Sequence, residues 1–229
     1  MNDNTIIQFR EGSMALALEG GYPVVTPENR FVHDARCAWL LDALEQHITS
    51  THEPRSRPGW FSASALGDTD EELIAAYRGE EKPAPDAKLA RVFSVGHDRD
   101  LTYKKWLHDA GLSAVGSDDD RKIRIPHLRL QGEADDILRS PTGFTVYEGK
   151  TINPYSFRKL EEPLPAHKLQ VTAYMAGLAL QDAIVLYECK GSQDWRAFYV
   201  PFDATLWSDT VTRLLRLRAL AEGEPIESK

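Results

Sequence analysis

Residues 130–151 read LQGEADDILRSPTGFTVYEGKT, and their pattern predicts two adjacent strands joined by a turn. Two strand-like segments flank SPTG at 140–143, where proline fixes φ and glycine accepts a positive φ, so the segment predicts a tight turn. A regular hairpin closed by this turn places Arg139 opposite Phe144. The same register places Asp135 opposite Glu148.

Facing carboxylates on two antiparallel strands need a physical reason. Their Cβ atoms lie about 5 Å apart and like charges there are destabilising, so a divalent cation between Asp135 and Glu148 is the usual explanation. Lys150 follows Glu148 by two residues and therefore shares its face of the strand. A hard cation such as Mg²⁺ accepts a few carboxylate oxygens and keeps waters. An ordinary cross-strand ion pair is the alternative, since the register also places Glu133 opposite Lys150.

Two predicted helices carry further polar patterns. The first begins at Asp86 and ends near Gly111, and it holds His97, Asp100 and Lys104 on one face. The second covers residues 166–180, where Gln170 and Tyr174 share a face at i and i+4.

The order of elements predicts the fold class. It fits an α/β (α+β) fold with a central mixed β-sheet flanked by helices. Besides the helices above, we expect helices at 64–78 and 206–221 and strands at 122–130, 131–138, 144–151, 183–189 and 196–202.

The chain divides near residue 58. Residues 51–59 contain no apolar side chain and form the best candidate linker. We therefore expect an N-terminal helical extension over 1–58, with an amphipathic helix at 34–48, and a larger domain over 59–229.

Composition narrows the function classes. The 27 basic and 35 acidic residues give a net charge of −8, which argues against coating nucleic acid by bulk charge but not against a local basic patch. Cys37 and Cys189 are far apart, so this chain alone holds neither a zinc site nor a four-cysteine cluster. Neither an apolar span nor an export signal is visible, and a cytoplasmic protein is expected.

Several short motifs occur in a characteristic order. Together they resemble the PD-(D/E)XK nuclease superfamily, in particular its RecB-like and phage-type exonuclease branch, and imply a restriction-endonuclease-like core. They are SASAL at 62–66, FSVG at 93–96, Gly132-x-x-Asp135, Glu148-x-Lys150 and Gln170-x-x-x-Tyr174.

The resemblance implies roles for the motif residues. Asp135 and Glu148 would bind catalytic Mg²⁺, with Mn²⁺ able to substitute, and the backbone carbonyl of Gly149 would add a ligand. Lys150 would position the attacking water. No iron-sulfur cluster is expected, because the cysteines for it are missing.

The first metal ligand remains open between two residues. Asp100 stands four residues after the glycine of FSVG, where the family has Glu or His, and we favour it. His97 lies one turn earlier and is the alternative.

The resemblance also implies DNA as the partner. Gln170 and Tyr174 would contact the site or the DNA backbone near it, and Ser64 belongs to a motif of the family. The basic residues Arg158, Lys159 and Lys168 lie between the lysine strand and the Gln/Tyr helix and are our candidates for backbone contacts. Arg213, Arg216 and Arg218 on the last helix are interpreted as a solvated face.

The expected activity is metal-dependent hydrolysis of phosphodiester bonds at DNA ends, in recombination, repair or phage DNA processing. A recombination protein or a single-strand-binding protein is the candidate partner. The alternatives are an endonuclease of the same fold and a non-catalytic nucleic-acid-binding or scaffold protein.

Overall fold

The computed structural model describes residues 57–80, 85–141 and 143–223, together with 40, 43, 44 and 46–48. The chain divides into two units, Met1–Glu45 and Gln46–Lys229. The described residues between 40 and 48 are helical, whereas most of the predicted extension over 1–58, with Cys37, lies outside the described residues. The boundary at residue 58 therefore stays a prediction.

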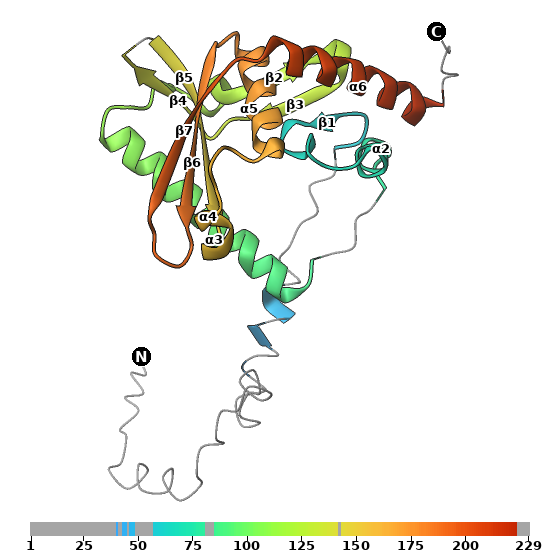
Figure 1. The fold of residues 1–229 in the computed structure, drawn as a ribbon. Helices are drawn as coiled ribbons and strands as arrows, with labels where there is room; N and C mark the ends of the chain where they lie inside the picture. Colours follow the sequence, from blue (N-terminus) through green and yellow to red (C-terminus); the bar gives the residue numbers. More distant parts are fainter. Residues whose placement is uncertain are drawn as a thin grey trace, which may run out of the picture. The chain divides into compact units, whose positions relative to one another are not determined.

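Two mixed sheets form the framework of the larger unit (Figure 1). The first has the order β1-β3-β2 and consists of β1 (Phe61–Ser62), β2 (Lys122–Ile125) and β3 (Leu130–Glu133). The second has the order β4-β5-β6-β7 and consists of β4 (Asp136–Ser140), β5 (Gly143–Ile152), β6 (Asp182–Cys189) and β7 (Trp195–Pro201). In each sheet one pair of strands is parallel and the others are antiparallel. The predicted mixed α/β architecture is confirmed, with its sheet divided in two.

The hairpin β4–β5 has the predicted register, since Arg139 pairs with Phe144. The pairing ends where Asp136 meets Tyr147, and Asp135 lies in a bend just before β4. From Glu148 onward, β5 is paired only with β6 among the described strands. The bend at Asp135 therefore opens one edge of β5.

The alternative ion pair between Glu133 and Lys150 is wrong. Glu133 lies in the other sheet, in register with Lys122, and its carboxylate is 3.2 Å from the Arg121 guanidinium. The cause is the bend, because the chain leaves β3 at Glu133 and enters a different sheet at Asp136.

The strand predicted at 122–130 is also interrupted. A 3₁₀ turn, η5 (Pro126–Leu128), follows β2, and Arg129 has a left-handed φ of 52° before β3 begins. Proline has no N–H to donate to a ladder, which explains why the strand stops there.

The helices begin where side chains cap them. The Asp86 carboxylate accepts a hydrogen bond of 2.7 Å from the Leu89 N–H and starts α3 (Ala87–Asp109), as expected. Helix α2 (Asp70–Arg78) begins later than predicted, because Thr69 and Glu72 form a capping box. The remaining elements are η3 (Ala63–Ala65), η4 (Asp118–Arg121), α4 (Pro154–Arg158), α5 (Pro165–Leu178) and α6 (Ala204–Glu222).

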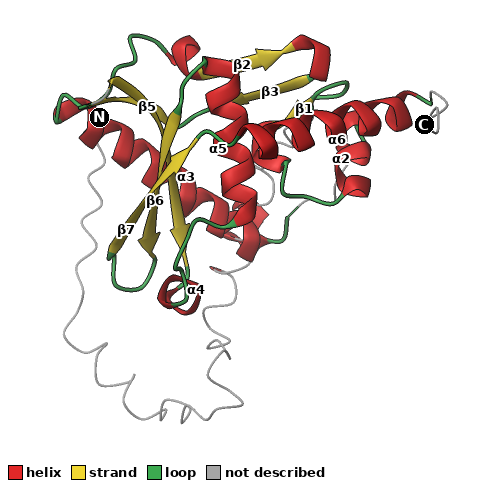
Figure 2. Ribbon diagram, turned by 45° about the horizontal axis from the view of Figure 1, so that its top comes forward, coloured by secondary structure: helices red, strands yellow, loops and turns green. Residues whose placement is uncertain are grey.

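Helix α5 stands between the two sheets (Figure 2), where it contacts β2, β5 and β6. Its buried residues Val171 and Met175 share one hydrophobic core with Val146 of β5 and Val185 of β6. Helix α6 packs on α2 and α5, and α3 contacts β5. None of the described helices is long and apolar enough to cross a membrane.

Arg213 of α6 is not the freely solvated residue that the sequence suggested, because its guanidinium is bound within the protein. Its guanidinium donates to the carbonyls of Leu66 and Asp68, at 2.7 Å each, and to the Asp70 carboxylate at 2.8 Å. Arg216 also pairs with Asp70, and Arg218 pairs with Glu222. The bonds of Arg213 and Arg216 fasten α6 to the start of α2 and the segment before it, whereas the Arg218–Glu222 pair lies within α6.

We expect Arg213→Ala to lower the free energy of unfolding by about 2 kcal/mol, because its charge-assisted hydrogen bonds to two backbone carbonyls and to the Asp70 carboxylate are lost. Arg216→Ala, which removes one exposed ion pair, should cost less than about 0.5 kcal/mol. Urea denaturation of both variants measures the difference. Equal losses would contradict the structural role of Arg213.

Candidate active site

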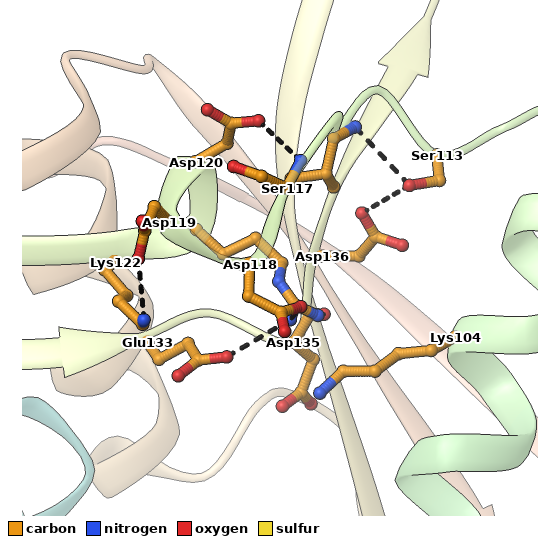
Figure 3. Close-up of polar contacts among 12 residues, drawn as sticks. Lys104, Ser113, Ser117, Asp118, Asp119, Asp120, Lys122, Glu133, Asp135 and Asp136 are labelled. Carbon is orange, nitrogen blue, oxygen red and sulfur yellow. Dashed lines mark hydrogen bonds and ion pairs between the residues drawn. The ribbon is translucent and has the colours of Figure 1, made fainter.

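Asp135 and Asp136 are adjacent in sequence but point to different sides of the bend (Figure 3). Asp136 is buried, and its carboxylate accepts hydrogen bonds from the Ser113 hydroxyl at 2.9 Å and the Ile137 N–H at 2.7 Å. The Asp135 carboxylate instead accepts a bond of 2.8 Å from the Gly149 N–H. Asp135 is thereby held at the open edge of β5.

Glu148 is 2% exposed and lies at the centre of a polar network. Its Oε1 is 2.6 Å from Lys150 Nζ and accepts a hydrogen bond of 2.8 Å from Gln170 Nε2. The same amide donates to the Tyr174 hydroxyl at 2.9 Å. Lys150 and Gln170 thus contact Glu148 directly, and Tyr174 contacts Gln170. Helix α5 supplies Gln170 and Tyr174.

One oxygen of this network has no partner. Glu148 Oε2 is buried and makes no hydrogen bond in the part of the chain that the structure describes. A buried carboxylate oxygen without a partner is costly unless something else binds it.

The electrostatics of Asp135 and Glu148 also favour the binding of a cation beside them. Burial, followed by the carboxylates of Glu148 and Asp100, raises the pKa of Asp135 to about 8. Burial likewise raises the pKa of Glu148. The two acids repel each other when ionised, so a cation bound between them would restore their charged forms.

A cavity of about 490 Å³ lies beside these residues. Asp135, Glu148 and Lys150 line it from the sheet, and His97 and Asp100 line it from α3. Asp100 also forms an ion pair with Lys104, whose Nζ is 2.8 Å from Asp100 Oδ2. Both candidates for the first metal ligand therefore face the same cavity, and the choice between them stays open.

Helix α3 is fastened to the sheet by a charged contact. The Arg99 Nε donates to both carboxylate oxygens of Glu188 on β6, at 2.8 Å each, and the Tyr103 hydroxyl donates to the same carboxylate. Glu188 is buried, and within α3 the buried residues are Ala90 and Tyr103. This contact sets the distance between Asp100 and the sheet.

Tyr147 is a cavity residue that the motifs did not indicate. Its hydroxyl is buried without a hydrogen-bond partner among the described residues. A Cβ atom on Gly149 would lie 3.1 Å from this hydroxyl and 3.6 Å from Asp135 Oδ2. Glycine at 149 therefore lets Tyr147 and Asp135 share the space above β5. Strand alternation places Tyr147 on the face opposite to Glu148, so the sequence pattern gave no signal for it.

His167 of α5 is a second residue that sequence reasoning missed. Its Nδ1 is 2.6 Å from the Tyr187 hydroxyl, which accepts a bond of 3.0 Å from the Leu164 N–H. Burial, together with the charge of Lys150, lowers the pKa of His167 to about 4. A neutral imidazole therefore lies near Lys150, whose neighbour on β6 is Tyr187.

The predicted DNA contacts do not line the cavity. Arg158 and Lys159 are exposed, Lys168 pairs with Glu162 at 2.6 Å, and the Ser64 hydroxyl is 2.9 Å from that of Ser62. Tyr174 is 2% exposed, which favours a role in positioning Gln170. Contacts of all these residues with DNA remain predictions.

The donors present fit a divalent cation with few protein ligands. No group of three or more His, Cys, Asp or Glu side chains in the described ranges forms a ready metal site. Mg²⁺, however, is commonly bound through one or two carboxylates and several waters. Asp135 and the unpartnered Glu148 Oε2 match that requirement.

The glycine of the Gly-x-x-Asp motif has a packing role. A Cβ atom on Gly132 would lie 2.8 Å from both Ala63 Cβ and Tyr174 Cε1. We expect Gly132→Ala to lower the free energy of unfolding by about 2 kcal/mol, because the core is overpacked. A Cβ atom on Gly96 of α3 would meet no described atom outside its own turn of helix within 4 Å, so Gly96→Ala should raise the free energy of unfolding by about 0.5–1 kcal/mol through helix propensity. Thermal and urea denaturation test both signs, and a stable Gly132→Ala variant would contradict the packing argument.

Comparison with known proteins identifies the fold. The chain is similar to the alkaline exonuclease LHK-Exo from Laribacter hongkongensis, with a TM-score of 0.54 and 16% identity over 78% of this chain and 93% of that one. The complex of LHK-Exo with dAMP gives a TM-score of 0.53 and 16% identity, covering 80% and 93%. No protein-family model and no curated protein matches the sequence. The chain thus shares the fold of this exonuclease.

Proposed function

We propose that this protein is a metal-dependent DNA exonuclease that hydrolyses phosphodiester bonds at DNA ends, in recombination, repair or phage DNA processing. The observation that carries the proposal is the pair of buried acids, Asp135 and Glu148, beside Lys150 on one cavity. The structural likeness to an alkaline exonuclease supports the same class of reaction.

Mg²⁺, or Mn²⁺ in its place, would be held by Asp135 and Glu148, with Asp100 or His97 and the carbonyl of Gly149 as further candidates. Such an ion supplies Lewis acidity that activates water and offsets the charge that develops at phosphorus.

The chain's own residues prepare the site. The Gly149 N–H fixes the orientation of Asp135, and Gln170 does the same for Glu148. Because Tyr174 accepts the second hydrogen of the Gln170 amide, the amide cannot rotate without losing a bond. Lys150 places a positive charge where the phosphate and the attacking water meet. Preorganised groups of this kind need no rearrangement during the reaction.

The test is incubation of the full chain with end-labelled linear duplex, linear single strands and covalently closed DNA, each with Mg²⁺, Mn²⁺ or a chelator. We expect metal-dependent release of short products from linear DNA and an intact closed substrate. Glu148→Gln, which keeps the shape of the side chain, should be inactive. Cleavage of closed DNA would favour an endonuclease, and no hydrolysis of any substrate would leave a binding protein.

A further inference from the structure

Two tryptophans lie side by side on the surface next to the cavity. Trp106 of α3 is 46% exposed and Trp195 at the start of β7 is 59% exposed, and their ring centroids are 6.5 Å apart. Both rings contact Tyr103, at centroid distances of 5.5 and 6.1 Å. Tyr103 lines the cavity, so the two tryptophans adjoin the cavity through Tyr103.

The position of this pair is fixed by the structure around it. The Arg99 guanidinium lies 5.9 Å from the centre of the Trp106 ring and is itself held by Glu188. The turn between β6 and β7 is closed by a bond of 2.8 Å from the Gln193 N–H to the Cys189 carbonyl, which sets the place of Trp195. Two large rings, tilted by 56° to each other and each about half exposed, are therefore held side by side.

A cation lines the same cavity as the acids. Lys190, in the same turn as Gln193, is exposed and lines the cavity, and its ammonium makes no ion pair within the described ranges. Arg99 is nearby, but its charge is neutralised by Glu188. A ligand that contacts both Lys190 and the tryptophan pair meets a positive charge at the cavity and exposed aromatic rings beside it.

Single-stranded nucleic acid has this chemistry. Its phosphates require cations, and its bases stack on aromatic side chains. In a duplex the faces of the bases are covered by the neighbouring base pairs, so exposed tryptophan rings can stack only on the bases of a strand that has separated from its complement. The bases of that strand have lost their stacking partners.

We propose that Trp106 and Trp195 form a stacking platform for the bases of single-stranded DNA whose phosphodiester lies in the cavity, and that Lys190 contacts a phosphate of the same strand. The proposal rests on the proposed function. It adds that the enzyme binds an unpaired end rather than an intact duplex.

Binding without cleavage tests the platform. The full chain, in chelator, is titrated into fluorescently labelled oligothymidylate, and anisotropy gives the dissociation constant. Trp106→Ala and Trp195→Ala should each weaken binding about tenfold, since stacking of one base is typically worth 1–3 kcal/mol. Trp195→Phe should restore most of the affinity. Tyr199→Ala is the matched control, because Tyr199 is an exposed aromatic residue of the same strand (67% exposed) whose ring makes no contact with Tyr103 or the tryptophans among the described residues.

Salt dependence separates the two kinds of contact. Lys190→Ala should reduce the slope of log affinity against log salt concentration by about 0.7, the value for one phosphate contact on a single strand. The tryptophan variants should keep the parent slope. Melting temperatures of all variants show whether they are folded.

Folded tryptophan variants that bind oligothymidylate as tightly as the parent would overturn the proposal. So would equal losses in Tyr199→Ala. Failure of the proposed function gives a different result, in which the parent binds single strands through the tryptophans but hydrolyses no DNA with metal.

Discussion

Lys150→Ala is expected to slow metal-dependent hydrolysis of linear DNA by about 10³-fold, because a preorganised charge at the reacting phosphate is typically worth 10²–10³ in kcat. The variant also leaves the Glu148 carboxylate without its ammonium partner at 2.6 Å. Initial rates at saturating DNA and Mg²⁺ measure the effect on kcat.

Lys122→Ala is the matched control for this loss. Lys122 is exposed and does not line the cavity. Its ammonium lies 2.7 Å from the carboxylate of Asp119, a residue of η4. Its removal should leave kcat unchanged. A Lys150→Ala variant that keeps its melting temperature and more than a tenth of the parent rate would contradict the role given to Lys150.

Asp135→Asn should stabilise the metal-free protein at alkaline pH. With a pKa of about 8 in the folded protein and 3.8 as its ordinary value, Asp135 keeps a proton on folding that the unfolded chain releases. Stability of the metal-free parent therefore falls as pH rises from about 4 to about 8. Because each pKa unit corresponds to 1.36 kcal/mol, we expect the variant to be more stable than the parent by at least about 2 kcal/mol at pH 8.5, with almost no difference near pH 4.

Urea denaturation in chelator at both pH values measures this difference. Asp136→Asn is the control, since its carboxylate is already satisfied by Ser113 and Ile137 and should gain no stability. Added Mg²⁺ should raise the melting temperature of the parent and leave that of Asp135→Asn nearly unchanged. A gain that does not depend on pH would rule out the carboxylate as its cause.

The parts of the fold that depend on local chemistry could be predicted from the sequence. The turn at 140–143 fixed the pairing of Arg139 with Phe144, and Asp86 correctly marked the start of α3. The i, i+4 spacing on α5 brings Gln170 and Tyr174 together, and both join the network of Glu148. Each of these features is decided within a few residues.

Features that depend on distant segments were missed. The division into two sheets follows from the bend at Asp135, and no residue type there marks a change of sheet. Lys190 reaches the cavity because β6 pairs with β5 in parallel, and His167 lies near Lys150 because α5 crosses between the sheets. Such long-range placements are set by packing of the whole core, which the local pattern does not contain.

The attachment of α3 to the sheet has a mechanical consequence. Of its 23 residues, the buried ones are Ala90 and Tyr103, and the charged contact of Arg99 with Glu188 holds it near its middle. The chain that follows α3 is bound to β4 as well, since the Arg139 N–H donates to the Leu112 carbonyl at 2.8 Å and the Ala114 N–H donates to the Ile137 carbonyl at 2.7 Å. Two attachments to one sheet resist both sliding and rotation of the helix, so the width of the cavity between α3 and the acids of the sheet is set before a strand enters it.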